Sequence, residues 1–232
     1  MQNIVDYIIN ANNNGNYYPL WGTCQGFEVI SMMVSRNYSI LGTCEGCTNV
    51  TVNNYFYSNY SSKMFEGMPS DFRQLMATAN LSYMDHVQQL DIDSWKYNPL
   101  WEANLTAITW ALSATNVPYV SSYESPQYPI YATQFHQEKS TYEWRMDLNY
   151  DINHDYNAVR LEQYLANFFV NECRKNFNDF DATNSDNDWM LIYNYNATQV
   201  PASIFTQVYL FLDTNLTAYQ AQRAYQYPNY IR

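Results

Sequence analysis

One cysteine of the chain lies in a context that suits a nucleophile. Residues 21–28 read Trp-Gly-Thr-Cys-Gln-Gly-Phe-Glu, so Cys24 stands between Gly22 and Gly26, after an apolar run and before a helix-like run. A strand, a sharp turn and a helix in this order form a nucleophile elbow, in which neighbouring glycines permit a strained backbone and a close approach. A helix that begins at the sulfur also favours the thiolate, which is the reactive form of cysteine.

A base and a group to orient it lie far downstream. Residues 134–139 read Gln-Phe-His-Gln-Glu-Lys, which places His136 two residues before Glu138. A cysteine on an elbow, a histidine and a carboxylate form a nucleophile, base and orienter in chain order. A cysteine in a glycine-flanked turn is more often structural, so the histidine–glutamate element is what favours catalysis. The expected chemistry is nucleophilic attack by Cys24 with proton transfer through His136.

The elements that position these residues alternate between strands and helices. Apolar periodicity and the Gly and Pro breaks define them, and residues 140–157 read as a polar loop. Residues 38–60 read as short strands and turns, and Ser70 reads as the N-cap of a further helix. The pattern predicts an α/β fold, a three-layer α/β/α sandwich with a mostly parallel central sheet, over residues 1–215, followed by an extension at 216–232. The expected helices are 3–12, 25–35 and 157–175, and the expected strands are 17–22, 80–86, 105–112, 118–124, 129–135, 189–195 and 204–212.

These motifs resemble the class I glutamine amidotransferase-like hydrolases, and within them the gamma-glutamyl hydrolases. The elbow at 18–28, Tyr-Pro-Leu-Trp-Gly-Thr-Cys-Gln-Gly-Phe-Glu, is similar to that family's elbow, and 129–136 resembles its histidine strand. The Tyr-Glu-Trp at 142–144 is the sharper resemblance, because general amidotransferases share only the histidine–glutamate element. The helix at 164–176 is also similar. The resemblance runs from about residue 10 to about residue 212.

The resemblance implies a cysteine peptidase that hydrolyses the γ-glutamyl amide bonds of folate polyglutamates through a thioester on the nucleophile. It implies no metal and no organic cofactor. The implied catalytic residues are Cys24, His136 and Glu138, with the backbone N–H of Gln25 in the oxyanion hole; the implied substrate-binding residues are His86, Tyr142 and Trp144.

Two departures from the family pattern bear on activity. Gln137 stands where the family usually has proline, and because the spacing is kept we expect little effect. Family members also carry strands and a Gly-rich turn before the elbow, whereas only about twenty residues precede Cys24 here, so we expect these N-terminal strands to be missing and the sheet edge to be open. The alternative is therefore a non-catalytic structural or binding subunit whose edge is completed by a partner chain or in a homodimer. A third hypothesis is the glutaminase part of an amidotransferase.

Composition narrows the partners and the compartment. The net charge of −11 argues against nucleic acid, so an anionic substrate would need a local basic pocket, for which Lys63, Lys139 and Arg145 are candidates. No apolar run reaches membrane-span length, and the N-terminus does not read as a signal peptide. Asn-x-Ser/Thr sequons favour a secretory route, in keeping with the lysosomal or secreted habit of the family, and would make the protein a glycoprotein. They begin at Asn37, Asn49, Asn59, Asn80, Asn104, Asn196 and Asn215.

The remaining cysteines invite other chemistry. Cys44 and Cys47 form a single Cys-Glu-Gly-Cys, which favours a local disulfide or two free thiols, and less so a redox pair or a zinc site. A zinc site would need further ligands, and the sequence has no second Cys-x-x-Cys and no His-x-x-x-His. Cys173 stands at an apolar position of the expected helix 157–175 and reads as a core residue.

Overall fold

The computed structural model describes residues 1–58, 61–144, 150–179, 192, 195–198 and 208–209. The chain divides into two compact units, Met1–Phe177 and Asn178–Arg232. The first unit holds all of the candidate site. In the second unit, β10 (Ala197–Thr198) pairs antiparallel with β11 (Val208–Tyr209). The expected strand 189–195 and the extension 216–232 lie largely or wholly outside the described residues, so the boundary at residue 215 stays a prediction.

The central sheet of the first unit has the order β1-β9-β8-β7-β4. Its strands are β1 (Leu20–Thr23), β4 (Tyr55–Phe56), β7 (Thr106–Leu112), β8 (Pro118–Glu124) and β9 (Ile130–Thr133). Only β1 and β9 run parallel, with Leu20 opposite Ile130 and Thr23 opposite Thr133. The pairs β9–β8, β8–β7 and β7–β4 are antiparallel. The α/β class is confirmed, but the sheet is mixed, and the expectation of a mostly parallel sheet is corrected.

The strand connections explain this correction. Residues 113–117 join β7 to β8, and residues 125–129 join β8 to β9. A parallel neighbour requires a crossover of a dozen or more residues, whereas a short loop returns the chain antiparallel. Asn116 has a φ of 63° in the first of these loops, which suits a tight turn. The parallel β1–β9 pair is instead formed by strands more than 100 residues apart in the chain.

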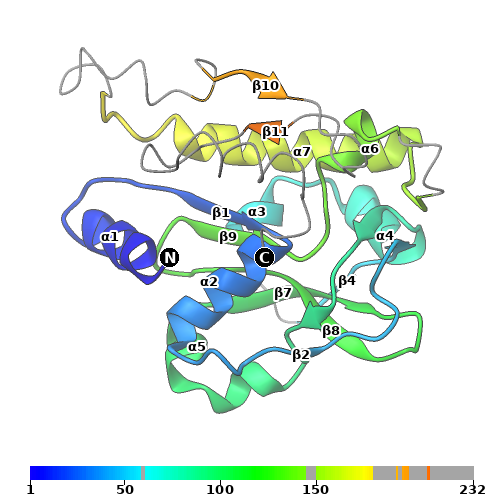
Figure 1. The fold of residues 1–232 in the computed structure, drawn as a ribbon, viewed down its shortest axis with the longest axis horizontal. Coiled ribbons are helices and arrows are strands. Elements are labelled where there is room, and N and C mark those ends of the chain that lie inside the picture. The colour runs from blue at the N-terminus through cyan, green and yellow to red at the C-terminus, as the bar shows by residue number, and fades with distance from the viewer. Residues whose placement is uncertain (59–60, 145–149, 180–191, 193–194, 199–207, 210–232) are drawn as a thin grey trace, which may run out of the picture. The chain divides into compact units, whose positions relative to one another are not determined.

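Helices cover both faces of the sheet, as the three-layer prediction requires. On one face lie α1 (Gln2–Asn13), α2 (Gln25–Ser35) and α5 (Pro99–Asn104), and on the other lie α3 (Lys63–Glu66), α4 (Ser70–Thr78) and α7 (Tyr156–Cys173). The first core lies under α1, α2 and α5, and the second core lies under α3, α4 and α7. In β9, Ile130 and Ala132 belong to the first core and Tyr131 belongs to the second, because side chains alternate along a strand. Figure 1 shows these helices and the sheet between them.

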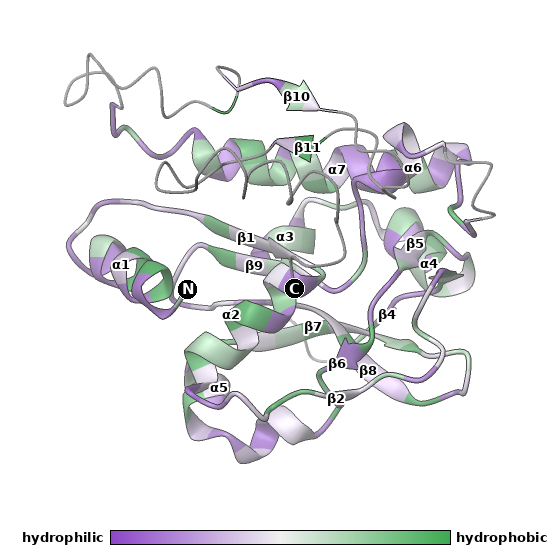
Figure 2. Ribbon diagram, in the orientation of Figure 1, coloured by the Kyte–Doolittle hydropathy of each residue, from purple (hydrophilic) through white to green (hydrophobic). Residues whose placement is uncertain are grey.

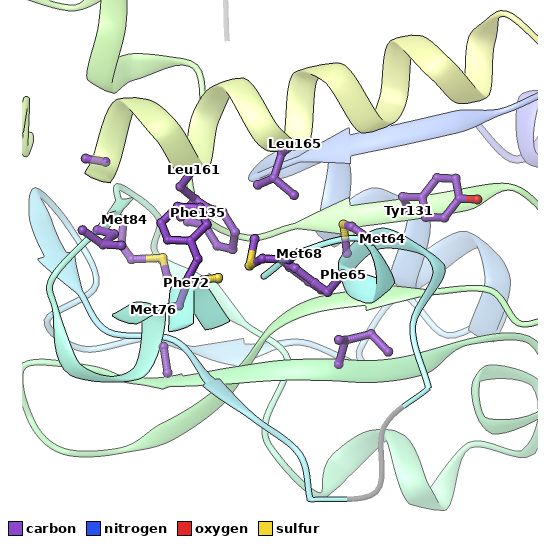
Figure 3. Close-up of a cluster of buried hydrophobic side chains, with 14 of the residues drawn as sticks. Met64, Phe65, Met68, Phe72, Met76, Met84, Tyr131, Phe135, Leu161 and Leu165 are labelled. Carbon is purple, nitrogen blue, oxygen red and sulfur yellow. The ribbon is translucent and has the colours of Figure 1, made fainter. Parts of the chain in front are cut away.

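The second core is rich in methionine and phenylalanine. Figure 3 shows Leu161 and Leu165 of α7 beside the side chains of α3, α4 and the sheet. Both leucines are almost fully buried. Figure 2 shows hydrophobic and hydrophilic residues around α7, as expected of a helix with one face on a core. Asp155 caps this helix, since its carboxylate accepts from the N–H groups of Asn157 and Ala158 at 2.9 Å each.

Smaller elements lie beside the sheet. The strand β2 (Gly42–Thr43) pairs antiparallel with β6 (Gln88–Gln89), and β3 (Val50–Val52) pairs antiparallel with β5 (Ser82–Met84). The 3-10 helix η1 (Ser94–Tyr97) precedes α5, and α6 (Lys139–Tyr142) follows the histidine strand. The expected strand 80–86 is thus present as β5, but it joins a two-stranded sheet and not the central one.

Two local predictions are wrong. Pro69, and not Ser70, is the N-cap of α4, since Ser70 already has helical geometry. Cys173 is exposed rather than a core residue. The preceding residue, Glu172, takes the inward position because the hydroxyls of Tyr17 and Tyr131 both donate to its carboxylate.

Candidate active site

The turn between β1 and α2 is a nucleophile elbow. Cys24 is the N-cap of α2 and has φ 52° and ψ −109°, a conformation that costs free energy for any residue other than glycine. Its N–H donates to the carbonyl of Thr133 at 2.8 Å, which fixes the end of β1 against β9. A Cβ on Gly22 would lie 2.6 Å from the carbonyl carbon of Gly26, so Gly22 is required, whereas a Cβ on Gly26 would meet nothing within 4 Å. Only one of the two glycines is needed for its lack of a side chain.

His136 interacts with both predicted partners. The parallel pairing of β1 and β9 brings the residues that follow each strand to the same edge of the sheet. His136 interacts with the Cys24 side chain, and its Nδ1 lies 2.6 Å from Oε1 of Glu138. The side chain of His136 is 18% exposed, so the ring reaches the surface beside the nucleophile. The structure therefore brings the predicted nucleophile, base and orienter together.

The charge state of this trio follows from its contacts. Burial lowers the pKa of His136, but the hydrogen bonds with Cys24 and Glu138 more than offset burial and raise it from 6.5 to about 9. Burial raises the pKa of Glu138, yet its hydrogen bond with His136 outweighs that effect and the pKa is lowered. At neutral pH the pair is thus an imidazolium held by a carboxylate.

Gln25 is the first residue of α2, where backbone N–H groups have no partner within the helix.

The connection between β5 and β6 lies against the predicted nucleophile, Cys24. Sγ of Cys24 lies 3.7 Å from the carbonyl oxygen of Asp85. The next residue, His86, is 4% exposed, with Nδ1 2.7 Å from the carbonyl oxygen of Gln88. Its ring also packs edge-on against Tyr119. Burial, aided by the charge of His136, lowers the pKa of His86 from 6.5 to about 4, although the hydrogen bond with the Gln88 carbonyl opposes this shift. The two rings are therefore close enough to interact.

A pocket of about 350 Å³ lies beside Glu138. Trp21, Thr141 and Tyr142 line it together with residues of α7. Tyr142 is highly exposed. Trp144 does not line this pocket. Its indole stacks on the ring of His154, with 3.8 Å between the ring centroids, and its Nε1–H donates to the carbonyl of Thr141.

The candidate basic residues differ in their surroundings. Nζ of Lys139 lies 5.8 Å from the ring of Tyr83 and 3.9 Å from the carboxylate of Glu143, near His136 in the chain. Nζ of Lys63 donates to the carbonyls of Ser125 and Pro126, which ties it to a turn. Arg145 lies outside the described residues.

Several curated proteins are similar to this chain over most of its length. No family model matches the chain. The human gamma-glutamyl hydrolase is 32% identical over 210 residues, which are 88% of this chain and 63% of that protein. Gamma-glutamyl hydrolase B of Dictyostelium discoideum is 32% identical over 90% of this chain and 59% of its own length, and the Bos taurus gamma-glutamyl hydrolase is 33% identical over 88% and 63%. The chain is a sequence relative of the gamma-glutamyl hydrolases.

This gamma-glutamyl hydrolase relative spans about three fifths of the length of the curated proteins it matches. A solved structure of a putative GMP synthase protein from Thermoplasma acidophilum aligns with a TM-score of 0.39 and 19% identity over 72% of this chain and 66% of that one.

Sequence reasoning gave Gln137 no role, although it lies within the predicted motif. Its amide bridges the hydroxyls of Thr23 and Thr133, at 3.0 and 2.6 Å, in either orientation of the amide. Thr23 directly precedes Cys24, and Thr133 lies three residues before His136. In this gamma-glutamyl hydrolase relative, Gln137 therefore links the strand before Cys24 to the strand before His136.

Proposed function

We propose that the chain carries the catalytic centre of a cysteine hydrolase that cleaves γ-glutamyl amide bonds of folate polyglutamates. The observation that carries this proposal is that the His136 ring interacts with the Cys24 side chain and hydrogen-bonds to the Glu138 carboxylate, beside a strained elbow. The similarity to gamma-glutamyl hydrolases supports the choice of substrate. The glutaminase hypothesis has no comparable support from these relatives.

Acylation follows from the geometry of the trio. The Cys24 thiolate attacks the γ-carbonyl carbon, and the backbone N–H of Gln25 donates to the oxyanion that forms. His136, which holds a proton at neutral pH, gives it to the leaving amine as the C–N bond breaks. The shortened folate remains as a thioester on Cys24, and the amine that leaves is the glutamyl portion beyond the cleaved bond. Glu138 keeps Nδ1 protonated and directs the other nitrogen of the ring to the reaction.

Deacylation reverses the role of the histidine. After proton donation, neutral His136 accepts a proton from water while that water attacks the thioester carbonyl. The C–S bond then breaks and the free γ-carboxylic acid leaves. The proton taken from water stays on His136, which restores the thiolate–imidazolium pair. The residues described here account for each proton transfer in this cycle.

Substrate contacts are proposed on the side of α6 and on the side of β5–β6. Tyr142 lines the pocket next to Glu138, so it could pack against an aromatic part of the substrate. We assign Lys139 to the glutamate carboxylates, because it is a basic residue three positions after His136. Trp144, stacked on His154, is proposed to shape the same region, and buried His86 is proposed to support the nucleophile side of the site.

The setting proposed for this activity is lysosomal or secreted, as a glycoprotein. Among the sequon asparagines that the structure describes, Asn80 and Asn196 are exposed and accessible to a glycan. None of the described helices is long and apolar enough to cross a membrane. Within the described strands, β1 is an edge of the central sheet, and we propose that a homodimer or a partner chain covers it.

The same edge favours the alternative, a non-catalytic subunit, and one assay separates the two. The protein carrying this chain is incubated with a folate polyglutamate of defined length, and the products are separated by chromatography. We expect shortened folates, and we expect the Cys24→Ala variant to lose at least about 10³-fold in rate. Cys173→Ala is the matched control, because Cys173 is an exposed free cysteine of α7 and should leave the rate unchanged.

An α-linked glutamyl isomer tests the bond specificity in the same assay. Cleavage of the γ-linked substrate alone supports the proposal. Absence of turnover by the unaltered protein, or equal turnover by Cys24→Ala, would favour the non-catalytic alternative.

A further inference from the structure

The two cysteines of the Cys-Glu-Gly-Cys loop meet a histidine that the sequence places about forty residues away. Cys44 and Cys47 are disulfide-bonded in the structure, which confirms one of the predicted alternatives. His86 joins them, and the ligand atoms of these three residues all lie within 4.8 Å of one another. The three residues are 6%, 0% and 4% exposed. Two sulfurs and an imidazole in one buried cluster are the donor types that zinc prefers.

His86 is prepared to act as a ligand. Its Nδ1 lies 2.7 Å from the carbonyl oxygen of Gln88, and a carbonyl can only accept, so Nδ1 carries the proton. Nε2 is therefore the nitrogen with the free lone pair. Nε2 is buried and has no hydrogen-bond partner within the described structure. A histidine whose outer N–H is held by a backbone carbonyl is the usual arrangement of a metal-ligating imidazole.

The backbone holds this cluster together independently of the S–S bond. The N–H of Cys44 donates to the carbonyl of Val87 at 2.9 Å, and the N–H of His86 donates to the carbonyl of Cys47 at 3.0 Å. The strands β2 and β6 pair directly beside the loop. The turn itself is fixed by Gly46, which has φ 76° and whose carbonyl accepts from the N–H of Ala114. Reduction of the disulfide would leave the three ligands in place.

We propose that Cys44, Cys47 and His86 form a zinc site when the Cys44–Cys47 disulfide is reduced. A phosphine reductant breaks the S–S bond, takes the oxygen of one water as phosphine oxide, and leaves a proton on each sulfur. Zn²⁺ then displaces these two protons and binds two thiolates and Nε2 of His86. A water or another small ligand completes four-coordination. In the oxidised protein the sulfurs are bonded to each other and the site does not form.

Zinc binding is measured on the reduced protein. The protein is treated with a phosphine, freed of reductant without oxygen and mixed with Zn²⁺, and bound metal is counted by mass spectrometry after gel filtration. We expect one Zn²⁺ per chain in the reduced protein and none in the oxidised protein. Co²⁺ serves as a second probe, because thiolate ligands give it intense charge-transfer absorption.

Matched variants separate this site from other thiols and histidines. Cys44→Ser, Cys47→Ser and His86→Asn should weaken zinc binding at least tenfold. Cys173→Ser, Cys24→Ala and His154→Asn should bind as the unaltered protein does, since none of these residues belongs to the cluster. Unchanged binding in His86→Asn, or equal loss in Cys173→Ser, would overturn the proposal.

Alkylation of the unaltered protein covers the case in which a variant fails to fold. Each cysteine of the reduced protein is labelled with and without Zn²⁺, and the labels are mapped by peptide mass spectrometry. The proposal requires Zn²⁺ to slow the labelling of Cys44 and Cys47 and to leave Cys173 unaffected. Equal rates of labelling at Cys44 and Cys47 with and without Zn²⁺ would reject it.

Discussion

In the proposed mechanism, Glu138 should control the pH range in which His136 can donate a proton. The leaving amine needs the imidazolium of His136, so kcat/KM should fall as the pH rises through the His136 pKa of about 9. The Glu138 carboxylate is one of the groups that raise this pKa. In Glu138→Gln the alkaline limb of the pH profile should therefore move to lower pH, and the maximum rate should fall because the ring is held less firmly.

The pH profile of kcat/KM measures this effect, and Glu143→Gln is its control. Glu143 is also a carboxylate of this segment, but it pairs with Lys139 at 3.9 Å rather than with His136. Its removal should leave the alkaline limb in place. Equal shifts in the two variants would show that general charge, and not the contact with Nδ1, sets the limb.

Gln137 should act as a positioning residue. Its amide joins Thr23 to Thr133, and these threonines flank the nucleophile and the histidine strand. Loss of the amide in Gln137→Ala should lower kcat by about 10- to 100-fold through small misplacements of the pair, with little change in KM. Gln163→Ala is the control and should leave kcat unchanged. Gln163, on α7, lines the pocket beside Glu138, as Gln137 does, but it does not join the two threonines. A change confined to KM would contradict the positioning role.

At the scale of elements, the elbow depends on one glycine more than on the other. A Cβ on Gly22 would lie 2.6 Å from backbone of Gly26 and 2.7 Å from Cδ1 of Ile30, whereas a Cβ on Gly26 meets open space. Gly22→Ala should lower the free energy of unfolding by at least about 1–3 kcal/mol. Gly26→Ala should be neutral, or stabilising by about 0.4–1 kcal/mol, because alanine suits the first turn of a helix. Urea denaturation of both variants measures the difference, and equal losses would contradict the close-approach argument.

The elements that sequence predicted well are those with local signals. Pro118 begins β8, Gln25 begins α2 after the elbow, and the apolar face of α7 carries Leu161 and Leu165. Apolar periodicity and the Gly and Pro breaks were therefore enough to predict these elements. Strand direction was predicted wrongly because it was taken from the fold class. The connections before Pro118 and before Ile130 are only five residues long, and so short a connection requires antiparallel neighbours. This length is visible in the sequence.

At the scale of the whole molecule, sequence could not show which distant residues meet. Cys24, His136 and Glu138 were predicted as a set because motif order implies it, and their contact required the parallel β1–β9 pair. The meeting of Cys44 and Cys47 with His86 had no such motif. It depends on the antiparallel pairing of β2 with β6. Each of these strands has only two residues, which is too short for a recognisable sequence pattern. Long-range pairing is the information that a pattern of single residues lacks.

The two cores on opposite faces of the sheet should respond independently to mutation. Ile30 belongs to the core under α2, and Leu165 belongs to the core under α7. Ile30→Val should cost about 0.5–1.5 kcal/mol and Leu165→Ala about 2–5 kcal/mol in unfolding free energy. Because the sheet separates them and they share no core, the double variant should equal the sum of the two within about 0.5 kcal/mol.

Leu161→Ala combined with Leu165→Ala supplies the contrast. These leucines lie one helical turn apart on α7 and fill the same core, so their losses should deviate from the sum by more than about 0.5 kcal/mol. Equilibrium denaturation of the single and double variants gives both coupling energies. If the pair across the sheet were coupled more strongly than the pair within one core, the central sheet would be transmitting strain, and the division of the first unit into two cores would fail.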